Sequence, residues 1–246
     1  MIILGIETSC DETSAAVIKI SRGSPRSTRV EAGSPRFHGE AGQISILSNI
    51  VSSQIEIHKE FGGVVPEVAA RHHVQNISWV IDEAISQAKI DYKKIDLIAT
   101  TTGPGLITSL IVGVEAAKAL SLAWQKPLVA INHLYGHIAA NFLPLTPALS
   151  QGERGARSPF PAVCLVVSGG HTELVLLKNY QQYKRIGQTV DDAAGEAFDK
   201  VAKLLHLGYP GGPIVSQRAV DGDSAAFKFP RPMIESPNFN FSFSGL

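Results

Sequence analysis

The stretch IILGIETSCDETSAAVIKI, residues 2–20, contains two apolar runs separated by a short polar segment. Ile2 to Glu7 and Ser14 to Ile20 have the composition of β-strands. The segment between them, Thr8 to Thr13, carries hydroxyl groups and carboxylates. We therefore predict a β-hairpin whose tip presents polar side chains.

The same order of an apolar strand, a polar turn and a second apolar strand returns in the second half. Pro161 to Val167 and Thr172 to Leu177 flank the turn Ser168-Gly169-Gly170-His171. Duplication of this unit is typical of the actin-like ATPase architecture of sugar kinases, heat-shock ATPases and actin. There, two facing hairpins hold phosphates between two domains, and glycines at the tips let backbone N–H groups approach phosphate oxygens. We predict an α/β fold of this two-domain type.

The segments between the two hairpins alternate between strand and helix patterns. Such alternation predicts a mainly parallel sheet. Apolar residues, with His72 among them, recur at helical spacing between Pro66 and Ala88. The expected strands are Gln43–Val51, Ile95–Thr101 and Pro127–Ile131, and the expected helices are Pro66–Ala88, Leu106–Trp124, Ala193–Leu205 and one from Ile214, with a tight turn at 103–105 and a rigid loop at 208–213.

Two stretches interrupt this order and are rich in Ser, Gly, Arg and Pro. Residues 21–42 have no periodicity and indicate a flexible insertion, and residues 145–159 indicate a linker or second insertion. We therefore predict a first actin-like domain over 1–144 and a second over 160–246. The arginines of 21–42 could contact RNA phosphates, but a solvated loop is the favoured interpretation.

The composition excludes several classes of protein. Lys+Arg and Asp+Glu are both 22, so no net charge attracts nucleic acid. Two isolated cysteines, Cys10 and Cys164, form no disulfide framework and suit a reducing compartment. We expect no signal peptide, because Glu7 breaks the short apolar N-terminal run. We also expect no membrane span, since no run approaches about 20 apolar residues. These features predict a cytoplasmic protein.

Two histidines follow the strand expected at Pro127–Ile131. His133 and His137 are four residues apart, and a helix places such residues one above the other on one face. They would lie where a strand ends and a helix begins, the edge at which open α/β sheets bind ligands. Two imidazoles placed this way could hold one metal ion. The alternative is a pair of solvated or core-capping histidines.

With these segments in order, the chain resembles the tRNA N6-adenosine threonylcarbamoyltransferase family, formerly described as O-sialoglycoprotein endopeptidases. The resemblance covers nearly everything outside the two insertions. The matching runs are GIETSCDET (5–13), GGVVPE (62–67) with ARHH (70–73), TGPGL (102–106), NHLYGH (132–137), VSGGHT (167–172), DDAAGEAFDK (191–200) and YPGGP (209–213).

The resemblance implies an acyltransferase that modifies tRNA. It would transfer the threonylcarbamoyl group of threonylcarbamoyl-adenylate to N6 of the adenosine beside the anticodon, in tRNAs reading codons that begin with A. It also implies partner subunits, namely an actin-like paralogue and a small ATPase.

Site residues and cofactors follow from the same resemblance. The metal ligands fall on His133 and His137, with iron(II) as the implied ion and zinc as the alternative, and magnesium would accompany a nucleotide. The adenylate-binding residues fall on Val166, Val167, Ser168, Gly169, Gly170, Asp199 and Gly212. Each has a simpler interpretation, because the glycines could only shape turns and Asp199 could be a helix-surface acid.

Asp11 and Glu12 lie at the expected tip of the first hairpin. One of them could act as a base for the adenine amine or orient a magnesium ion, and a solvated turn is the alternative. We interpret Cys10 as a packed residue and not as a nucleophile, since no histidine is near it in the motif. His72 and His73 indicate a surface basic cluster that could help contact RNA.

Three other functions compete with the transferase. A kinase or ATPase of the same fold would explain the hairpins but gives no role to the histidine pair. A zinc protease would need His-Glu-x-x-His, and Leu134 occupies the glutamate position. A non-catalytic scaffold subunit of the same pathway is disfavoured by the intact histidine and glycine motifs.

The last residues, Asn240 to Leu246, fall within a motif that continues in family members. We therefore expect a second domain that is incomplete and that lacks later metal and adenosine ligands. On this view the chain alone binds metal weakly and has little activity, because a site short of ligands is weak.

Overall fold

The computed structural model describes residues 1–21, 43–141, 160–180 and 182–245. These residues form two compact units. Unit 1 comprises the described residues of 1–54 and 66–133, and unit 2 comprises those of 55–65, 134–141 and 160–245. Apart from Ser21, the predicted insertion 21–42 and the predicted linker 145–159 lie outside the described residues.

Unit 1 is built on a five-stranded sheet with the order β3-β2-β1-β4-β5. The predicted hairpin is confirmed, because β1 and β2 pair antiparallel across a turn of four residues. The sheet is mixed and not mainly parallel, since β2 is antiparallel to both neighbours while β1, β4 and β5 are parallel. A connection this short can join only antiparallel strands. The strands are β1 (Ile2–Glu7), β2 (Glu12–Ser21), β3 (Gln43–Ser53), β4 (Leu97–Gly103) and β5 (Leu128–Asn132).

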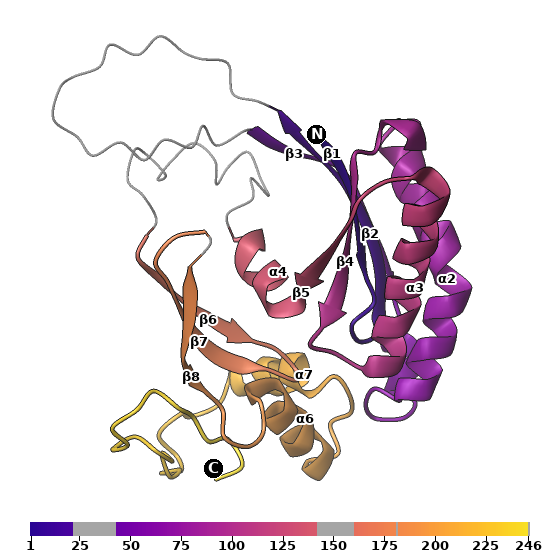
Figure 1. Cartoon of the computed structure of the whole chain (residues 1–246). Coiled ribbons are helices and arrows are strands. Elements are labelled where there is room, and N and C mark those ends of the chain that lie inside the picture. The colour runs from indigo at the N-terminus through magenta and orange to yellow at the C-terminus, as the bar shows by residue number, and fades with distance from the viewer. Residues whose placement is uncertain (22–42, 142–159, 181, 246) are drawn as a thin grey trace, which may run out of the picture. The chain divides into compact units, whose positions relative to one another are not determined.

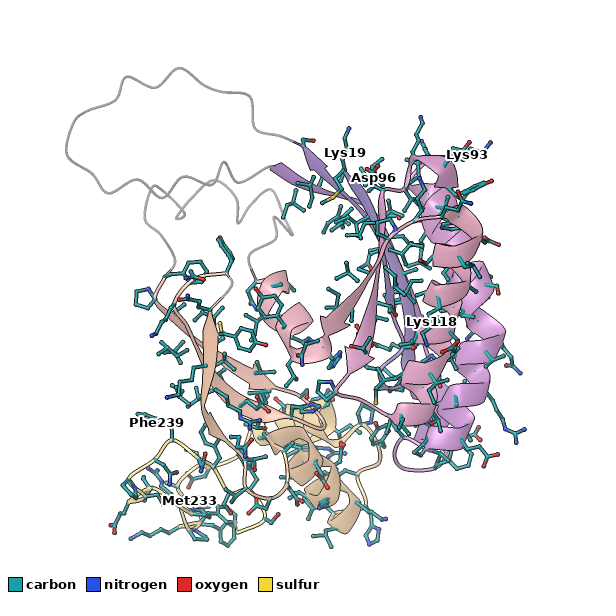
Figure 2. The ribbon with its side chains drawn as sticks, viewed as in Figure 1. Lys19, Lys93, Asp96, Lys118, Met233 and Phe239 are labelled. Atoms are coloured by element: carbon teal, nitrogen blue, oxygen red, sulfur yellow. The ribbon has the colours of Figure 1, made fainter. Side chains whose placement is uncertain are left out.

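Two helices cover one face of this sheet, α2 (Pro66–Gln87) and α3 (Ile107–Trp124), side by side in Figure 1. The core between the layers contains Leu4, Val17, Val80 and Ile98, all fully buried. At the opposite end of β1 from the turn, the Asp96 carboxylate, labelled in Figure 2, accepts a hydrogen bond from the Ile2 amide at 2.7 Å. The 3-10 turn η1 (Tyr92–Lys94) precedes β4.

Helix α3 is long and apolar enough to cross a membrane by length and composition alone, contrary to the expectation that no segment is. In the structure it packs against the sheet and α2, with Leu110, Gly113 and Ala117 buried. Ile107, Ile111 and other apolar side chains on its remaining surface are exposed. The sheet-facing side is therefore that of a core helix, and the rest of its surface carries exposed apolar side chains together with the charged pair Glu115 and Lys118.

The turn after β1 is fastened to α3 by the side chain of Thr8. The Thr8 hydroxyl donates to the Ser109 carbonyl at 2.8 Å and accepts from the Gly113 amide at 3.1 Å. These two backbone groups are ones that a regular helix pairs with each other. A Cβ atom on Gly113 would lie 2.4 Å from the Thr8 hydroxyl oxygen, so the contact requires glycine. The Ser9 carbonyl also accepts from the Leu106 amide at 2.8 Å.

Unit 2 contains an antiparallel sheet of β6 (Ala162–Val167), β7 (Thr172–Leu177) and β8 (Tyr183–Gln188). The hairpin of β6 and β7 confirms the second predicted strand pair. Its helices are α1 (Ile55–Lys59), most of α4 (His133–Ala140), α6 (Ala194–Leu204) and α7 (Gly211–Ala219). Sequence analysis missed β8 and α1. It also placed the start of α7 three residues late, because Pro213 is tolerated in the first helical turn.

The described residues after α7 pack on the end of β8 through Asp191. Its carboxylate accepts hydrogen bonds from the Phe243 amide at 2.8 Å and the Ser244 amide at 3.2 Å, and from the Ser242 hydroxyl. The same segment, which includes Phe239 in Figure 2, lies against Gly187, where a Cβ atom would be 1.9 Å from the Phe239 carbonyl oxygen. The NFSFSG motif therefore has a defined place in unit 2.

Substitution of Gly113 by alanine should destabilise unit 1, because the new methyl group would collide with the Thr8 hydroxyl. We expect a loss of about 1–3 kcal/mol in the free energy of unfolding, measured by urea denaturation followed by circular dichroism. Gly136→Ala is the control, since its Cβ meets nothing within 4 Å and a helical alanine should stabilise by about 0.5–1 kcal/mol. Equal stability of Gly113→Ala and the unsubstituted chain would contradict the Thr8 contact.

Candidate functional site

Polar groups meet where the three parallel strands of unit 1 end. Glu7 ends β1, Thr101 lies near the end of β4, and His133 follows β5 as the first residue of α4. The Thr101 hydroxyl donates to Glu7 Oε2, and His133 Nδ1 lies 3.2 Å from the same oxygen. Ser9 joins them, with its amide donating to Glu7 Oε1 and its hydroxyl 3.1 Å from His133 Nδ1. We call Glu7, Ser9, Thr101 and His133 the strand-end cluster.

Glu7 is an ionised carboxylate at neutral pH. Partial burial alone would raise its pKa, but hydrogen bonds from His133, Ser9 and Thr101 outweigh the burial and lower the pKa to about 2. Sequence analysis assigned no role to Glu7. A charged residue closing an apolar strand at this edge was the signal that could have found it.

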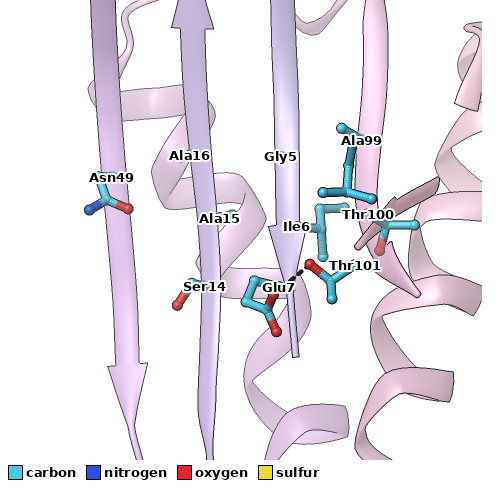
Figure 3. Close-up of a pocket in the computed structure, with 11 residues that line it drawn as sticks. Gly5, Ile6, Glu7, Ser14, Ala15, Ala16, Asn49, Ala99, Thr100 and Thr101 are labelled. Atoms are coloured by element: carbon cyan, nitrogen blue, oxygen red, sulfur yellow. Dashed lines mark hydrogen bonds between the residues drawn. The ribbon is translucent and has the colours of Figure 1, made fainter. Parts of the chain in front are cut away.

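A cavity of about 260 Å³ lies along the sheet beside Glu7 (Figure 3). It is lined mainly by small residues of neighbouring strands, among them Gly5, Ala16 and Ala99, and Figure 3 shows the Thr101–Glu7 hydrogen bond where β1 ends. The small side chains leave this part of the sheet surface open next to the strand-end cluster.

Asp11 and Glu12, the predicted acid–base pair, lie close to this edge. The Asp11 carbonyl accepts from the Gln54 amide at 3.0 Å, which fixes the turn to the end of β3. Glu12 is the first residue of β2 and is exposed. Partial screening from water, and the negative charges of Asp11 and Glu7, raise the pKa of the Glu12 carboxyl. A raised pKa is the direction that a general base requires.

The sequence suggested that His73 belongs to a surface basic cluster, and the structure shows that it does not. His73 is fully buried under the turn, and His72 is only half-buried. The sequence analysis had assigned His72, the neighbouring residue, to the buried side of the helix. His73 Nε2 is 3.0 Å from the Cys10 carbonyl, and Nδ1 is 2.8 Å from the Thr13 hydroxyl. A carbonyl can only accept, so Nε2 carries the proton. His73 therefore connects the turn residue Cys10 to Thr13 in β2 through hydrogen bonds to both.

The thiol of Cys10 is a poor nucleophile. The residue is exposed, but its sulfur is partly screened from water, and this burial together with the Asp11 and Glu12 carboxylates raises the pKa of the thiol to about 12. The nearby histidine contacts the Cys10 carbonyl and not its sulfur. Both observations agree with the expectation that Cys10 is not a nucleophile, but its exposure contradicts the expectation that it is a packed residue.

The predicted metal ligands lie on α4. His133 is its first residue and His137 its fifth, so they are one helical turn apart. His133 is held by Glu7 and Ser9, whereas His137 is exposed. The described ranges contain no group of three or more His, Cys, Asp or Glu side chains arranged to hold a metal ion. The donor set is thus two imidazoles, which suit iron or zinc better than magnesium.

In unit 2 the turn Ser168–His171 is closed by its own hydrogen bonds. The Ser168 amide donates to the His171 carbonyl at 2.8 Å, and the His171 amide donates to the Ser168 hydroxyl at 3.0 Å. A Cβ atom on Gly169 or Gly170 would meet no atom within 4 Å, so this glycine turn has open space around it.

The start of α6 lies against the glycine turn. The Gly195 amide donates to the Ser168 carbonyl at 3.2 Å, and a Cβ atom at Gly195 would be 2.6 Å from that carbonyl oxygen. Sequence analysis did not identify Gly195, because its partner is distant in the sequence. The contact places the helix start, where amide groups concentrate, beside the open glycines.

One of the predicted metal ligands shares a cavity with part of the predicted adenylate-binding stretch. A cavity of about 160 Å³ in unit 2 is lined by His137, Ile138, Asn141 and residues 164–168. Val166 is 8% exposed and Val167 is 53% exposed. The Val166 side chain is therefore packed inside the protein, whereas the Val167 side chain is accessible to a ligand. Residues that are remote in the sequence are thus brought together.

Asp199 and Gly212, the remaining predicted nucleotide contacts, lie at the junction of α6 and α7. Asp199 Oδ1 accepts from the Gly211 amide at 2.7 Å and so caps the start of α7. A Cβ atom at Gly211 would be 2.5 Å from the Phe198 carbonyl oxygen, whereas one at Gly212 would meet nothing within 4 Å. Gly211 is therefore the glycine that packing requires, and Gly212 lies in the first turn of α7 with open space beside it.

Comparison of the amino-acid sequence with known proteins shows the family of this chain. The model of the family described as tRNA N6-adenosine threonylcarbamoyltransferase matches residues 45–246. The chain belongs to this family. Proteins of that description from Thermosipho africanus and Syntrophomonas wolfei are 50% and 49% identical to it over its whole length. The predicted family and the α/β class are thereby confirmed.

The chain spans 64% of the length of the Thermosipho protein and 63% of the Syntrophomonas protein. Among solved structures, it is similar to YeaZ from Pseudomonas aeruginosa, with 14% identity and a TM-score of 0.39 over 78% of this chain and 65% of that one.

Replacement of His73 by alanine should destabilise unit 1 by about 2–4 kcal/mol, because it leaves a buried cavity and unpaired groups at Cys10 and Thr13. Denaturant unfolding measures the loss. His72→Ala is the matched control and should change stability by less than about 0.5 kcal/mol. Equal effects of the two substitutions would show that His73 does not support the turn.

The Cys10 thiol should react slowly with iodoacetamide. At pH 8 its thiolate fraction is about 1,000-fold below that of an ordinary thiol, and the higher nucleophilicity of a basic thiolate recovers about 20-fold, so we expect alkylation about 50-fold slower. The rate should rise steadily with pH beyond pH 9. Mass spectrometry of a Cys164→Ser chain measures it, and Asp11→Asn should accelerate it several-fold. A rate equal to that of a free cysteine peptide would contradict the raised pKa.

Proposed function

We propose that this chain carries the donor-binding and metal-binding parts of a tRNA threonylcarbamoyl transferase. In the proposed reaction, N6 of the adenosine beside the anticodon bonds to the carbamoyl carbon of threonylcarbamoyl-adenylate. The bond from that carbon to the phosphate oxygen breaks, and AMP leaves with the electron pair. The observation that carries the proposal is the cavity that His137 shares with Val166, Val167 and Ser168.

The glycine turn suits the phosphate or the carbonyl oxygen of the donor. Gly169 and Gly170 have no neighbouring atoms where side chains would be, so a ligand can approach the turn from that side. The start of α6 beside them adds the positive end of a helix dipole. Both groups are fixed before a ligand arrives, which is what electrostatic stabilisation of developing charge requires.

Asp199 and Gly212 are proposed to contact the nucleoside part of the donor. Asp199 uses Oδ1 to cap α7, which fixes the orientation of its carboxylate. A fixed carboxylate is a suitable acceptor for two ribose hydroxyl groups. The open space beside Gly212 would allow a nucleoside to approach the start of α7.

His133 and His137 are proposed to hold one divalent ion, iron(II) by family resemblance or zinc. When bound, such an ion supplies a Lewis acid that lowers the cost of charge on the carbamoyl group. Glu12, whose pKa is raised, is proposed to accept the proton of the adenine amine. Asp11 is proposed to orient the amine or a nucleotide-bound magnesium ion. Because that amine is a poor nucleophile, positioning should contribute more than base strength.

The proposed partners are tRNA, the adenylate donor, an actin-like paralogue and a small ATPase, and the proposed location is the cytoplasm. Exposed apolar residues on the adjacent helices α2 and α3, among them Val74, Ile107 and Ile111, support a protein partner. The net charge is zero, so tRNA binding would depend on local groups or on these partners.

Binding of a sulfamoyl analogue of threonylcarbamoyl-adenylate, measured by calorimetry, tests the donor site. Gly169→Leu should weaken binding by about tenfold or more, because the side chain fills space that the ligand needs. The fold should tolerate it, since the position is open. Gly63→Leu, at another open glycine, is the matched control and should bind as the unsubstituted chain does.

A transfer assay extends the same test to the reaction. Unmodified tRNA and preformed donor are incubated with the chain and its partner proteins, and mass spectrometry detects the modified nucleoside. Equal affinity of the Gly169→Leu and Gly63→Leu variants for the analogue would refute the donor site. Equal activity of the two would refute its use in transfer.

A further inference from the structure

The hairpin formed by β7 and β8 is a basic region in a chain without net charge. Residues 178–185, with the sequence KNYQQYKR, span its turn and the start of β8 and carry three cations. No acidic residue occurs between Glu173 and Asp191. At 0.1 M salt such a region attracts a polyanion over about 10 Å. The hairpin is therefore a place where nucleic acid could bind despite the balanced total charge.

The two lysines of this hairpin are available to an anion. Lys178 and Lys184 are exposed, and neither forms an ion pair with another residue that the structure describes. Lys184 is opposite Leu176, which precedes Lys178 by two residues, so both lysines lie on the same face of the hairpin. The third cation, Arg185, already contacts Glu173 at 3.3 Å.

Two tyrosine rings of the same hairpin are also exposed. Tyr180 is 55% exposed and Tyr183 is 53% exposed. Each packs against one other ring, since the centroids of Tyr180 and Phe160 are 4.6 Å apart and those of Tyr183 and Tyr135 are 5.3 Å apart. Aromatic rings that are held in place and half open to solvent are platforms on which unpaired bases stack.

Tyr135 places these rings near the cavity proposed for the donor. Its hydroxyl donates a hydrogen bond to the Tyr180 carbonyl, and Tyr135 lies on α4. Ile138 follows three residues later and lines the cavity that His137 shares with residues 164–168. Residues three apart on a helix are neighbours, with Cβ atoms about 5–6 Å apart. A base on the tyrosines would therefore lie close to this cavity.

The combination of lysines and open rings favours RNA over an acidic protein. The carboxylates of a protein partner would match only the lysines, whereas single-stranded RNA offers phosphates to the lysines and base faces to the rings. Tyr183 is opposite Leu177 and so lies on the other face from Lys184. A flexible strand can pass over β8, the outer strand of its sheet in Figure 1, and contact both faces.

We propose that the β7–β8 hairpin binds single-stranded RNA, with Lys178 and Lys184 contacting phosphates and with Tyr180 and Tyr183 stacked on unpaired bases beside the modified adenosine. This inference rests on the proposed transfer to tRNA and names the part of the chain that holds this substrate. The anticodon loop supplies the unpaired bases.

Fluorescence anisotropy of a labelled anticodon stem-loop RNA tests the phosphate contacts. The double variant Lys178→Gln, Lys184→Gln should bind about tenfold or more weakly at 0.1 M salt. The slope of log affinity against log salt should fall by about 1.4, because each lost contact removes about 0.7. Lys93→Gln, Lys94→Gln is the matched control, since both lysines are exposed in η1 of unit 1. Equal affinity and slope of the two double variants would overturn the inference.

The same titration tests the stacking. Tyr180→Leu, Tyr183→Leu should weaken binding about fivefold or more at every salt concentration and leave the slope unchanged. Tyr180→Phe, Tyr183→Phe keeps both rings and should bind as the unsubstituted chain does. Thermal melting followed by circular dichroism shows whether the leucine variant folds, and the lysine variant decides the matter if it does not. A folded leucine variant with full affinity would refute the inference.

Other outcomes separate this inference from the proposed function. If RNA binding depends on the hairpin but the chain with its partners forms no modified nucleoside, the transfer reaction is refuted and the RNA surface stands. If transfer occurs and the lysine variant binds and modifies tRNA normally, only the hairpin's role is wrong. Loss of a partner protein from the lysine variant, with unchanged RNA affinity, would show that the hairpin binds protein and would overturn the inference.

Discussion

The hydroxyl of Thr8, placed between the Ser109 carbonyl and the Gly113 amide, is the constraint on which the polar edge of unit 1 depends. It fixes the turn after β1 to α3. The neighbouring Ser9 carbonyl adds a bond to the Leu106 amide, and His73 supports the turn from below. Because the turn cannot shift, the Ser9 amide can hold the Glu7 carboxylate and Glu7 can hold the ring of His133.

In unit 2 the turns are placed by close backbone packing. Gly195 lets α6 begin against the Ser168–His171 turn, and Gly211 lets α7 begin against α6. The Asp199 carboxylate closes the second of these junctions through the Gly211 amide. Glycine has two uses here: Gly195 and Gly211 permit contact within the protein, whereas Gly169, Gly170 and Gly212 leave space outside it.

Most of the fold was predictable because the apolar patterns are strong and local. β1, β2, α3 and the β6–β7 hairpin follow from runs of apolar residues bounded by polar turns. β8 was missed because Tyr183, Lys184 and Arg185 are exposed at the start of a strand that pairs along one side only. The mixed direction of the first sheet was underestimated because β3 pairs with β2 and not with β4.

The candidate site was predictable only in part. The histidine pair and the glycine turn were selected from the sequence because their residue types suit the chemistry, and their roles stay predictions. Glu7, His73 and Gly195 were not, because each acts through a partner 27 or more residues away, such as Ser168 for Gly195 and Cys10 for His73. Periodicity cannot distinguish His72 from His73 when a single position decides which side chain is buried.

The contact between Thr8 and Gly113 also restricts how relatives of this protein can diverge. An alanine at position 113 would need a residue without γ atoms, such as alanine, at position 8, because the Thr8 hydroxyl oxygen would lie 2.4 Å from the new methyl group and the methyl group of a valine would collide as well. Both bonds to α3 would then be lost. The two positions are thus sterically coupled, so a substitution at either one alone costs stability that only a change at the other could restore.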